Sequence, residues 1–398
     1  MKIKENVYAV GVQNPSLRVF DIIMKTEYGT TYNAYLVKGN EKNALIELVH
    51  ADFWDEYIEN ITALTDIKSI DYVILNHTEP DHSGSIIKLL ELNPNITIIT
   101  SMAGQKYLRA IANRDFNSQI VRDGDTLDLG GKTLRFFSAP FLHWPDSMFT
   151  YIQEDSILFS CDFLGAHFCE PRGVDTKIAY DKRYNKSFLY YYNAIFGPFK
   201  EYVLKGLDKI SDLNLDVVCP SHGPILTTSI NAAIFKYRGW SEAALQKNDI
   251  KKVFILYASA YGCTATLAKA IADGISIHGN FDIENVNVLD ITLDEIKEKI
   301  DVSDVIIFGS PTLNRDAVKP IWDALSVVDA ITNRDKIAGA FGSYGWSGEA
   351  VKMLIDRMIG LKLKVIGNGV RANFAPSQDE IKTAFEYGEE IAKNIITA

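Results

Sequence analysis

The second half of the chain alternates apolar, strand-like segments with segments of helical periodicity, and few folds satisfy this pattern. Each expected strand is followed directly by an expected helix. The strands are 253–259, 281–289, 305–310, 336–343 and 363–367, and the helices are 264–275, 293–300, 317–328, 349–360 and 379–395. This alternation predicts an α/β domain with a doubly wound parallel sheet, which binds ligands at the carboxyl ends of its strands.

The first half has short strands separated by turns, and helices lie between only some of them. The expected strands are 7–12, 31–37, 43–48, 71–77, 96–101, 133–140, 156–162 and 215–222, with a helix near 53–64. This pattern predicts a mixed α/β sandwich. A polar stretch, residues 239–252, separates the two halves, so we expect two domains, 1–249 and 250–398.

Charge and composition exclude several classes of partner. The net charge of −10 argues against binding to nucleic acid or to anionic membranes. The sequence has neither an apolar run long enough to span a membrane nor an N-terminal secretory segment. The four cysteines are scattered and form no CxxC motif. We therefore expect a protein of the reducing cytoplasm, without disulfides or a thiolate metal site.

Residues 76–84, NHTEPDHSG, form the densest polar cluster in the sequence. The segment follows an expected strand and contains His77, Glu79, Asp81 and His82. Such side chains cannot be buried without partners. The segment is therefore either a metal-binding loop or an unusually polar turn.

Three other expected strands end in residues of the same kind. His143 follows one strand, Asp162 another and His222 a third. Four strand ends that meet at one place can assemble a single site from distant segments. The combined set of candidate metal ligands is His77, Glu79, Asp81, His82, His143, Asp162 and His222.

This set has more nitrogen and oxygen ligands than one tetrahedral zinc ion needs. It suits two metal ions, with Asp162 as a bridging carboxylate. Carboxylates and imidazoles without sulfur favour iron or manganese, although zinc also accepts these ligands. A single histidine after a strand is usually structural, but four strand ends with ligand residues favour a metal centre.

HTEPDH resembles the HxExDH variant of the metallo-β-lactamase signature, whose hydrolases usually have histidine in place of Glu79. Together with HWPDS, CDF and PSHG, it resembles the flavodiiron proteins over nearly the whole chain. The resemblance implies an N-terminal metallo-β-lactamase-like αββα sandwich and a C-terminal flavodoxin-like domain. It implies one iron held by His77, Glu79, His143 and Asp162, and another by Asp81, His82, Asp162 and His222. In some family members the residue that matches His82 is not a ligand.

The resemblance also implies that the second domain binds FMN. The loop after its first strand, SAYGCTAT (259–266), is neither a P-loop nor a GxGxxG motif. Its hydroxyls and the N–H groups at a helix N-terminus suit one terminal phosphate. It matches the flavodoxin [ST]xTGxT loop in part, because Tyr261 stands where threonine is common.

Two further loops, 309–314 and 342–350, follow the third and fourth strands. Their glycines permit close approach of the backbone, and Trp346 or Tyr344 could stack on a flavin ring. The expected FMN-binding residues are Ser259, Tyr261, Gly262, Cys263, Thr264, Pro311, Thr312, Leu313, Asn314, Ser343, Tyr344, Gly345, Trp346, Ser347 and Gly348.

Counting electrons connects the two sites. FMN can hold two electrons and an iron pair two more, which is enough to reduce O2 to water, and two electrons couple two NO into N2O. We therefore expect an oxidoreductase that reduces O2, NO or both. Tyr191 or its neighbour Tyr192 matches a family tyrosine, so Tyr191 is a candidate catalytic hydrogen-bond donor, with a core aromatic as the alternative. Asp21 stands where many relatives have histidine, which leaves the choice between O2 and NO open.

The sequence has no rubredoxin-like pair of CxxC motifs and no nicotinamide-binding fold, so we expect an external electron donor such as rubredoxin or a reduced deazaflavin. The resemblance implies a head-to-tail homodimer or a dimer of dimers. Two alternatives are a zinc-dependent hydrolase with an accessory flavodoxin module and a plain electron carrier. Glu79 argues against the hydrolase, and the converging ligands argue against the carrier.

Overall fold

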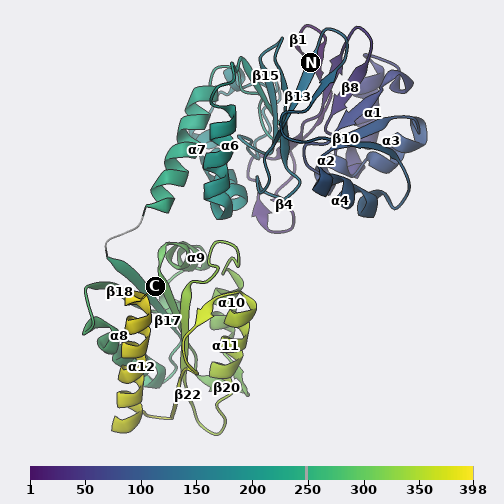
Figure 1. Ribbon diagram of the computed structural model, residues 1–398. Helices are drawn as coiled ribbons and strands as arrows, with labels where there is room; N and C mark the ends of the chain where they lie inside the picture. The colour runs from purple at the N-terminus through teal and green to yellow at the C-terminus, as the bar shows by residue number, and fades with distance from the viewer. Residues whose placement is uncertain (247–249, 398) are drawn as a thin grey trace. The chain divides into compact units, whose positions relative to one another are not determined.

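The protein folds into two compact units, Met1–Gln246 and Lys247–Ala398 (Figure 1). The computed structural model describes residues 1–246 and 250–397. The predicted domain boundary between residues 249 and 250 adjoins 247–249, which lie outside the described residues, and it stays a prediction.

Two sheets form the centre of the first unit. The larger has the order β1 (Lys2–Lys4), β2 (Val7–Ala9), β7 (Tyr35–Lys38), β8 (Asn43–Ile46), β9 (Tyr72–Ile74), β10 (Thr97–Thr100) and β11 (Asn117–Ile120). The smaller has the order β12 (Thr126–Asp128), β13 (Thr133–Ser138), β14 (Met148–Ile152), β15 (Ile157–Cys161) and β16 (Val217–Pro220). Strands β8 to β11 are parallel to one another.

Alternation along each strand builds the core between these sheets. Tyr35 and Val37 of β7 share one buried cluster with Leu134 and Phe136 of β13, whereas Leu36 belongs to another. Helices α1 (Trp54–Thr62), α3 (Ile86–Leu92) and α4 (Met102–Ala112) lie beside the larger sheet, and α6 (Lys200–Ile210) and α7 (Ile230–Leu245) beside the smaller one (Figure 1). The predicted αββα sandwich is confirmed.

The second unit contains one parallel sheet with the order β18 (Phe281–Asn287), β17 (Lys251–Tyr257), β19 (Val305–Gly309), β22 (Ile337–Tyr344) and β23 (Lys364–Val365). Strand β24 (Val370–Asn373) also pairs with β22 in parallel. This is the flavodoxin-like strand order. The covering helices are α8 (Cys263–Ser276), α9 (Leu293–Val302), α10 (Lys319–Ser326), α11 (Ala350–Gly360) and α12 (Gln378–Ile396).

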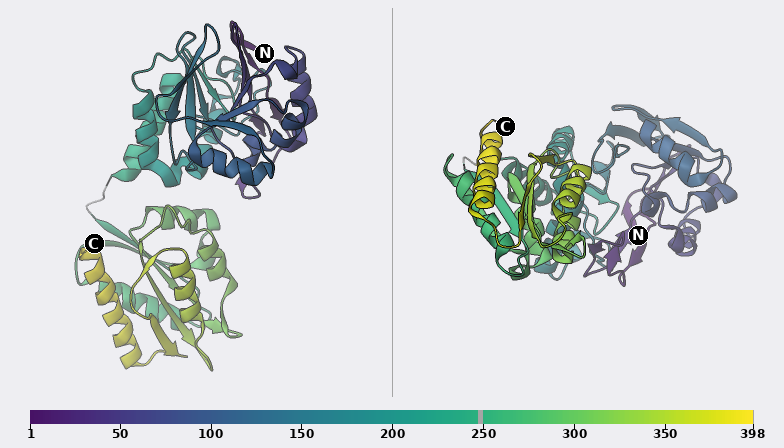
Figure 2. Two further views of the ribbon diagram at one scale, coloured as in Figure 1. Left: turned by 45° about the vertical axis from the view of Figure 1, so that its right-hand side comes forward. Right: turned by 90° about the horizontal axis from the view of Figure 1, so that it is seen from below.

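Both faces of this sheet are buried, as a doubly wound fold requires. Phe254 and Leu256 of β17 pack in a cluster with residues of α9, α10 and α11. Val253 and Ile255 pack in another cluster with residues of α8 and α12. Figure 2 shows α12 in yellow on one side of the sheet and the yellow-green helices on the other. The predicted fold of the second domain is confirmed.

Several segment predictions were too long. Predicted strand 7–12 is divided between β2 and β3 (Val12–Asn14), and β3 pairs with β6 (Thr30–Tyr32) in a separate sheet. Gly11 lies at the division, where an added Cβ would be only 2.2 Å from the carbonyl oxygen of Tyr32. The close approach of the two backbones there requires glycine.

Two segments of the second unit also differ from their predictions. Predicted helix 317–328 begins at Lys319, because Asp316–Ala317 forms strand β21 with Thr312–Leu313, strand β20. Predicted strand 363–367 is short, and Gly367 and Gly369 turn the chain between β23 and β24 with φ values of 58° and 71°. No helix of the described residues is long and apolar enough to cross a membrane.

Candidate functional site

The HTEPDH segment turns its polar side chains inward through a short helix. Strand β9 ends at Ile74, and helix α2 (Pro80–Ser83) begins after Glu79 with proline in its first turn. Asp81 and His82 lie on this helix and are buried. Their carboxylate and imidazole therefore face the same interior space as the ends of the neighbouring strands.

Three of the predicted ligands form a first group. Oε2 of Glu79 lies 3.1 Å from Nε2 of His77 and 3.4 Å from Nε2 of His143. Oδ2 of Asp162 joins them, 3.4 Å from Nε2 of His143 and 3.8 Å from Nε2 of His77. His77, Glu79 and His143 could hold one metal ion, and Asp162 lies close enough to join them.

Three other predicted ligands form a second group. Oδ2 of Asp81 lies 3.0 Å from Nε2 of His222 and 3.3 Å from Nε2 of His82. The other oxygen of Asp162, Oδ1, lies 3.3 Å from His82 and 3.4 Å from His222. Asp162 thus presents one carboxylate oxygen to each group, which is the geometry of a bridging ligand.

Fixed ring orientations show that a cation suits this site. Nδ1 of His222 lies 2.6 Å from the carbonyl oxygen of Thr31 and must donate its proton there. A neutral His222 therefore presents an Nε2 lone pair to Asp81, whose two buried oxygens have no hydrogen-bond partner among the described residues. Two facing acceptors are unfavourable unless a proton or a metal ion lies between them.

The second ring is held in the same way. Nδ1 of His77 lies 3.1 Å from both oxygens of Asp146, so its Nε2 faces the other ligands. Asp146 also accepts hydrogen bonds from the backbone N–H and the hydroxyl of Thr78, at 2.8 and 2.7 Å. Asp146 thus orients a ligand without binding metal itself. Asp146 lies in the HWPDS segment, but this role was not predicted from the sequence.

The charges of the site also fit metal ions. Burial alone would raise the pKa of Asp162, but the neighbouring His82 and His143 hold that pKa well below its usual value. Burial opposes the charged form of His82, but Asp81 and Asp162 raise its pKa to about 10. His82 therefore carries a proton at neutral pH that a bound metal ion must displace.

Two buried residues beside His82 were not predicted. Atoms of Glu47, His82 and Cys161 lie within 4.8 Å of one another. Burial raises the pKa of the Cys161 thiol well above its usual value, so it stays protonated and is a poor ligand. Cys161 and Glu47 both have positive φ, 53° and 60°, and such strain in non-glycine residues is typical of functional sites.

Tyr191 lies at the site, and its side chain reaches one of the predicted ligands, Asp162. Its buried hydroxyl donates a hydrogen bond of 3.1 Å to Oδ1 of Asp162. Burial, and then Asp162, raise the pKa of Tyr191 well above its usual value, so the hydroxyl keeps its proton. Tyr192, the alternative, instead pairs with Ser241 at 2.8 Å.

Asp21 also lies at this site, as expected. It occupies the turn between β4 (Val19–Phe20) and β5 (Met24–Lys25), and the next residue, Ile22, is 94% exposed. Burial, and then Glu79, raise the pKa of Asp21 to about 7.

The space between the ligands is a cavity of about 10 Å³, room for a molecule of the size of water. The lining residues are Phe20, Asp21, Glu79, Asp81, His82, His143, Asp162, His167, Tyr191, Ile195 and His222.

The loops at the carboxyl ends of the strands in the second unit present hydroxyl groups rather than metal-ligand side chains. Gly262, with φ of 84°, precedes helix α8 and gives it no side-chain cap. The hydroxyls of Thr264 and Ser343 lie 2.9 Å apart, and Oγ of Ser259 accepts from the N–H of Ala265 at 3.3 Å. Hydroxyls from separate loops thus meet at an uncapped helix N-terminus, which fits a phosphate group.

Large aromatic side chains are exposed at the same edge. Tyr261 is 92% exposed and Trp346 is 80% exposed. Exposed rings beside a phosphate-binding turn fit the apolar ring of a flavin. The other predicted flavin residues occupy the same strand-end loops: Cys263 begins α8, Ser343 and Tyr344 end β22, Gly345, Ser347 and Gly348 precede α11, and Pro311, Thr312, Leu313 and Asn314 follow β19.

Phe374 is a neighbour of this edge that the sequence analysis missed. It follows β24, is largely exposed, and has a φ of 51°. A Cβ on Gly345 would lie 2.8 Å from its ring. The only signal in the sequence was its position directly after the last short strand.

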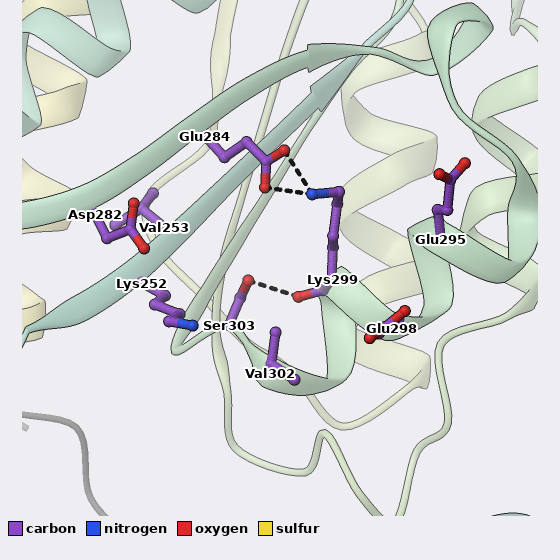
Figure 3. A pocket seen from close by; sticks show the side chains of 9 residues that line it. All are labelled: Lys252, Val253, Asp282, Glu284, Glu295, Glu298, Lys299, Val302 and Ser303. Atoms are coloured by element: carbon purple, nitrogen blue, oxygen red, sulfur yellow. Dashed lines mark hydrogen bonds and ion pairs between the residues drawn. The ribbon is translucent and has the colours of Figure 1, made fainter.

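A larger cavity of about 340 Å³ lies elsewhere on the second unit (Figure 3). It is at the amino ends of β17 and β18, the opposite edge from the expected flavin loops. Two of its charged groups pair, since Nζ of Lys299 lies 2.6 Å from Glu284. The lining residues are Lys252, Val253, Asp282, Glu284, Glu295, Glu298, Lys299, Val302 and Ser303.

Comparisons with known proteins agree with both domains. The model of the ODP family beta lactamase matches residues 30–223, and the flavodoxin model matches residues 255–388. The flavo-diiron protein FprA2 of Clostridium acetobutylicum is 53% identical, over 99% of each chain. A protein of Moorella thermoacetica named nitric oxide reductase is 32% identical, over 99% of this chain and 98% of its own.

Solved structures give the same result. The flavodiiron protein of Giardia intestinalis has a TM-score of 0.69 at 29% identity and covers 100% of this chain and 96% of its own. Rubredoxin oxygen:oxidoreductase of Desulfovibrio gigas has a TM-score of 0.71 at 28% identity, covering 100% of this chain and 98% of its own.

The fold and the site define a two-domain oxidoreductase, with a metallo-β-lactamase-like metal domain and a flavodoxin-like flavin domain. The chain belongs to the flavodiiron proteins, at 53% identity over almost its full length. The cofactors of this family are FMN and a diiron site, and the residues described above fit both. The predicted family, fold class and cofactors are therefore confirmed.

Proposed function

We propose that this chain reduces O2 to water, NO to N2O, or both, with electrons delivered through FMN. His77, Glu79 and His143 with Asp162 hold one iron, and Asp81, His82 and His222 with Asp162 hold the other. The observation that carries this proposal is Asp162, whose two oxygens face two separate groups of ligand atoms. A hydrolase that binds a single metal ion needs no carboxylate that faces two groups of ligand atoms.

The protein's own residues position and enclose the reaction. When bound, FMN and the two irons supply the electrons, two from the flavin and two from the metals. Tyr191 fixes Asp162 through its hydrogen bond, and Asp146 fixes His77.

The partners in this proposal are the substrate and an external electron donor, either rubredoxin or a reduced deazaflavin. The similar proteins from Desulfovibrio gigas and Moorella thermoacetica are named for oxygen and nitric oxide, so both substrates deserve testing. A cytoplasmic location is part of the proposal and is supported by the four cysteines, all of which are free.

Anaerobic purification tests the proposal first. The protein should hold about two irons, as the two ligand groups require, and about one FMN. It should consume O2 or NO when reduced by either donor. Stoichiometric zinc without flavin absorbance would support the zinc-dependent hydrolase and contradict the reductase.

We also propose that the active form is a head-to-tail homodimer, alone or paired in a tetramer, in which the FMN of one subunit serves the metal site of the other. Co-expression of an Asp162→Ala chain with a Trp346→Ala/Thr264→Val chain tests this. Heterodimers should recover part of the O2 or NO consumption that both homodimers lack. Absence of recovery in heterodimers verified by mass would show that each subunit works alone.

A further inference from the structure

His167 is a buried histidine that lines the metal-site cavity but belongs to neither ligand group. It follows Asp162 on the segment after β15. Its ring lies against Phe20, with centroids 4.3 Å apart, and is perpendicular to Tyr191 at 4.9 Å. Because the ring is fixed on both sides, its two nitrogens have defined surroundings.

The hydrogen bonds around His167 determine which nitrogen carries the proton. Nδ1 of His222 donates to the carbonyl oxygen of Thr31, so it cannot accept from Thr30. The hydroxyl of Thr30 lies 2.8 Å from Nδ1 of His167 but 3.4 Å from that same carbonyl oxygen. Nδ1 of His167, at the shorter distance, is therefore the better acceptor for the Thr30 proton. A neutral His167 therefore accepts at Nδ1 and carries its proton on Nε2.

This Nε2–H group has no acceptor. Nε2 of His167 is buried and has no hydrogen-bond partner within residues 1–246 and 250–397. A buried donor without an acceptor is unfavourable and is usually explained by a bound molecule or a functional role. The nearby hydroxyl of Tyr191 donates its proton to Asp162, and its oxygen makes no hydrogen bond with Nε2 of His167. His167 thus supplies the unused donor at the cavity.

We propose that His167 is a substrate-binding residue whose Nε2–H donates a hydrogen bond to the small molecule bound in this cavity. The bound species is a small hydrogen-bond acceptor such as O2, NO or azide. Thr30 is a positioning residue, because its hydroxyl selects the tautomer of His167. This inference rests on the proposed diiron function.

Azide binding provides a test that does not depend on turnover. Azide is titrated into the oxidised, iron-loaded protein, and its visible charge-transfer band gives the Kd. His167→Leu removes the donor, and we expect binding about tenfold weaker, the effect of one lost hydrogen bond to an anion. His167→Gln keeps an N–H donor and should bind within about threefold of the parent.

Two controls separate recognition from damage to the site. Tyr192→Phe removes a buried hydroxyl that pairs with Ser241, outside the cavity, and should leave azide binding unchanged. Iron content should stay at the parent value in all three variants. Unchanged azide binding in iron-replete His167→Leu would overturn the inference. Loss of iron from both His167 variants would also overturn it, by making His167 part of the metal site.

A second measurement reads the tautomer of His167 in the parent protein. Long-range 15N–1H NMR spectra of the zinc-loaded protein report the tautomer of each histidine, and His167→Gln assigns the signal. We expect His167 to be neutral with its proton on Nε2, and Thr30→Val to weaken that preference. A proton on Nδ1 in the parent would overturn the inference.

The outcomes distinguish this inference from the proposed function. A parent protein without iron, or without an azide band, would contradict the diiron function itself. A parent that binds azide normally, with a His167→Leu variant that binds it equally well, contradicts only the role of His167.

Discussion

The metal centre and the flavin loops are built on opposite principles. At the metal centre, buried side chains converge, and Asp146 and Thr31 fix two of the rings. At the flavin edge, hydroxyls meet at a helix N-terminus, while Tyr261 and Trp346 lie exposed. The metal centre therefore depends on polar groups buried in the fold, whereas the flavin site depends on exposed loops.

The largest expected effect separates the two regions. Asp162→Ala removes a ligand from both groups, so iron affinity should fall by more than about 100-fold, further than in His82→Ala. FMN content should not change, because the flavin loops belong to the other unit. Iron and FMN are measured on the same sample, with the exposed Asp212→Ala as the control. Equal, small iron losses from Asp162→Ala and His82→Ala would exclude a bridging role.

The reciprocal change sharpens the comparison from the flavin side. Trp346→Ala with Thr264→Val removes an exposed ring and a hydroxyl at the helix N-terminus, and FMN should bind about 50-fold more weakly. Fluorescence titration of the apoprotein with FMN gives the affinity. Iron content serves as the internal control and should stay at the parent value. FMN binding at parental affinity would place the flavin elsewhere.

Asp146, which is not a predicted metal ligand, tests whether the orientation of the His77 ring affects iron affinity. Asp146→Ala frees Nδ1 of His77, and iron affinity should fall by about 30-fold, as for other residues that orient a histidine ligand. Competition with a chelator measures the affinity. Asp146→Asn, which can still accept a hydrogen bond from His77, should lose less. Parental iron affinity in Asp146→Ala would mean that packing alone holds the ring.

The smallest expected effect concerns stability away from both sites. Asp175 accepts hydrogen bonds from the N–H groups of Thr227, Thr228 and Ser229, at 3.0, 2.9 and 2.8 Å. Burial alone would raise the pKa of Asp175, but the bonds from Ser229 and Thr227 lower it to about 2. Asp175→Asn should reduce the free energy of unfolding by about 1 kcal/mol at neutral pH, allowing for solvent screening.

The sign of the pH dependence follows from this lowered pKa. A carboxylate with a depressed folded pKa stabilises the protein fully above its unfolded value of about 3.9. The contribution is lost as pH falls from about 4 toward 2. Denaturant unfolding of parent and Asp175→Asn should therefore converge over that range. A constant difference, or the same change in Asp212→Asn, would exclude the hydrogen-bonded carboxylate as the cause.

The two regions also explain what the sequence could predict. Strand-end histidines and carboxylates were identifiable because each follows an expected strand directly, so ligands distant in the sequence could be grouped without coordinates. The alternation of strands and helices fixed the second fold for a similar reason. Both signals are periodic or occur at defined places along the chain.

The residues that support the ligands left no such signal. Asp146, Thr30 and His167 contact residues far away in the sequence, and no spacing rule connects them. Tyr191 was expected at the site, but only the structure places its hydroxyl on Asp162. The division of strand 7–12 at Gly11 likewise depends on the close approach of Tyr32, a tertiary contact.

The central claim is that electrons held in both regions meet a small oxidant at the metal centre. A single-turnover experiment with fully reduced protein tests it directly, with H2O2 and remaining O2 measured after addition of limited O2, and N2O measured after NO. We predict full reoxidation without peroxide, or N2O formation, in the parent, and loss of that reaction in Asp162→Ala. Stoichiometric peroxide and no N2O in both proteins would contradict the claim, because free flavin chemistry would then explain the reaction.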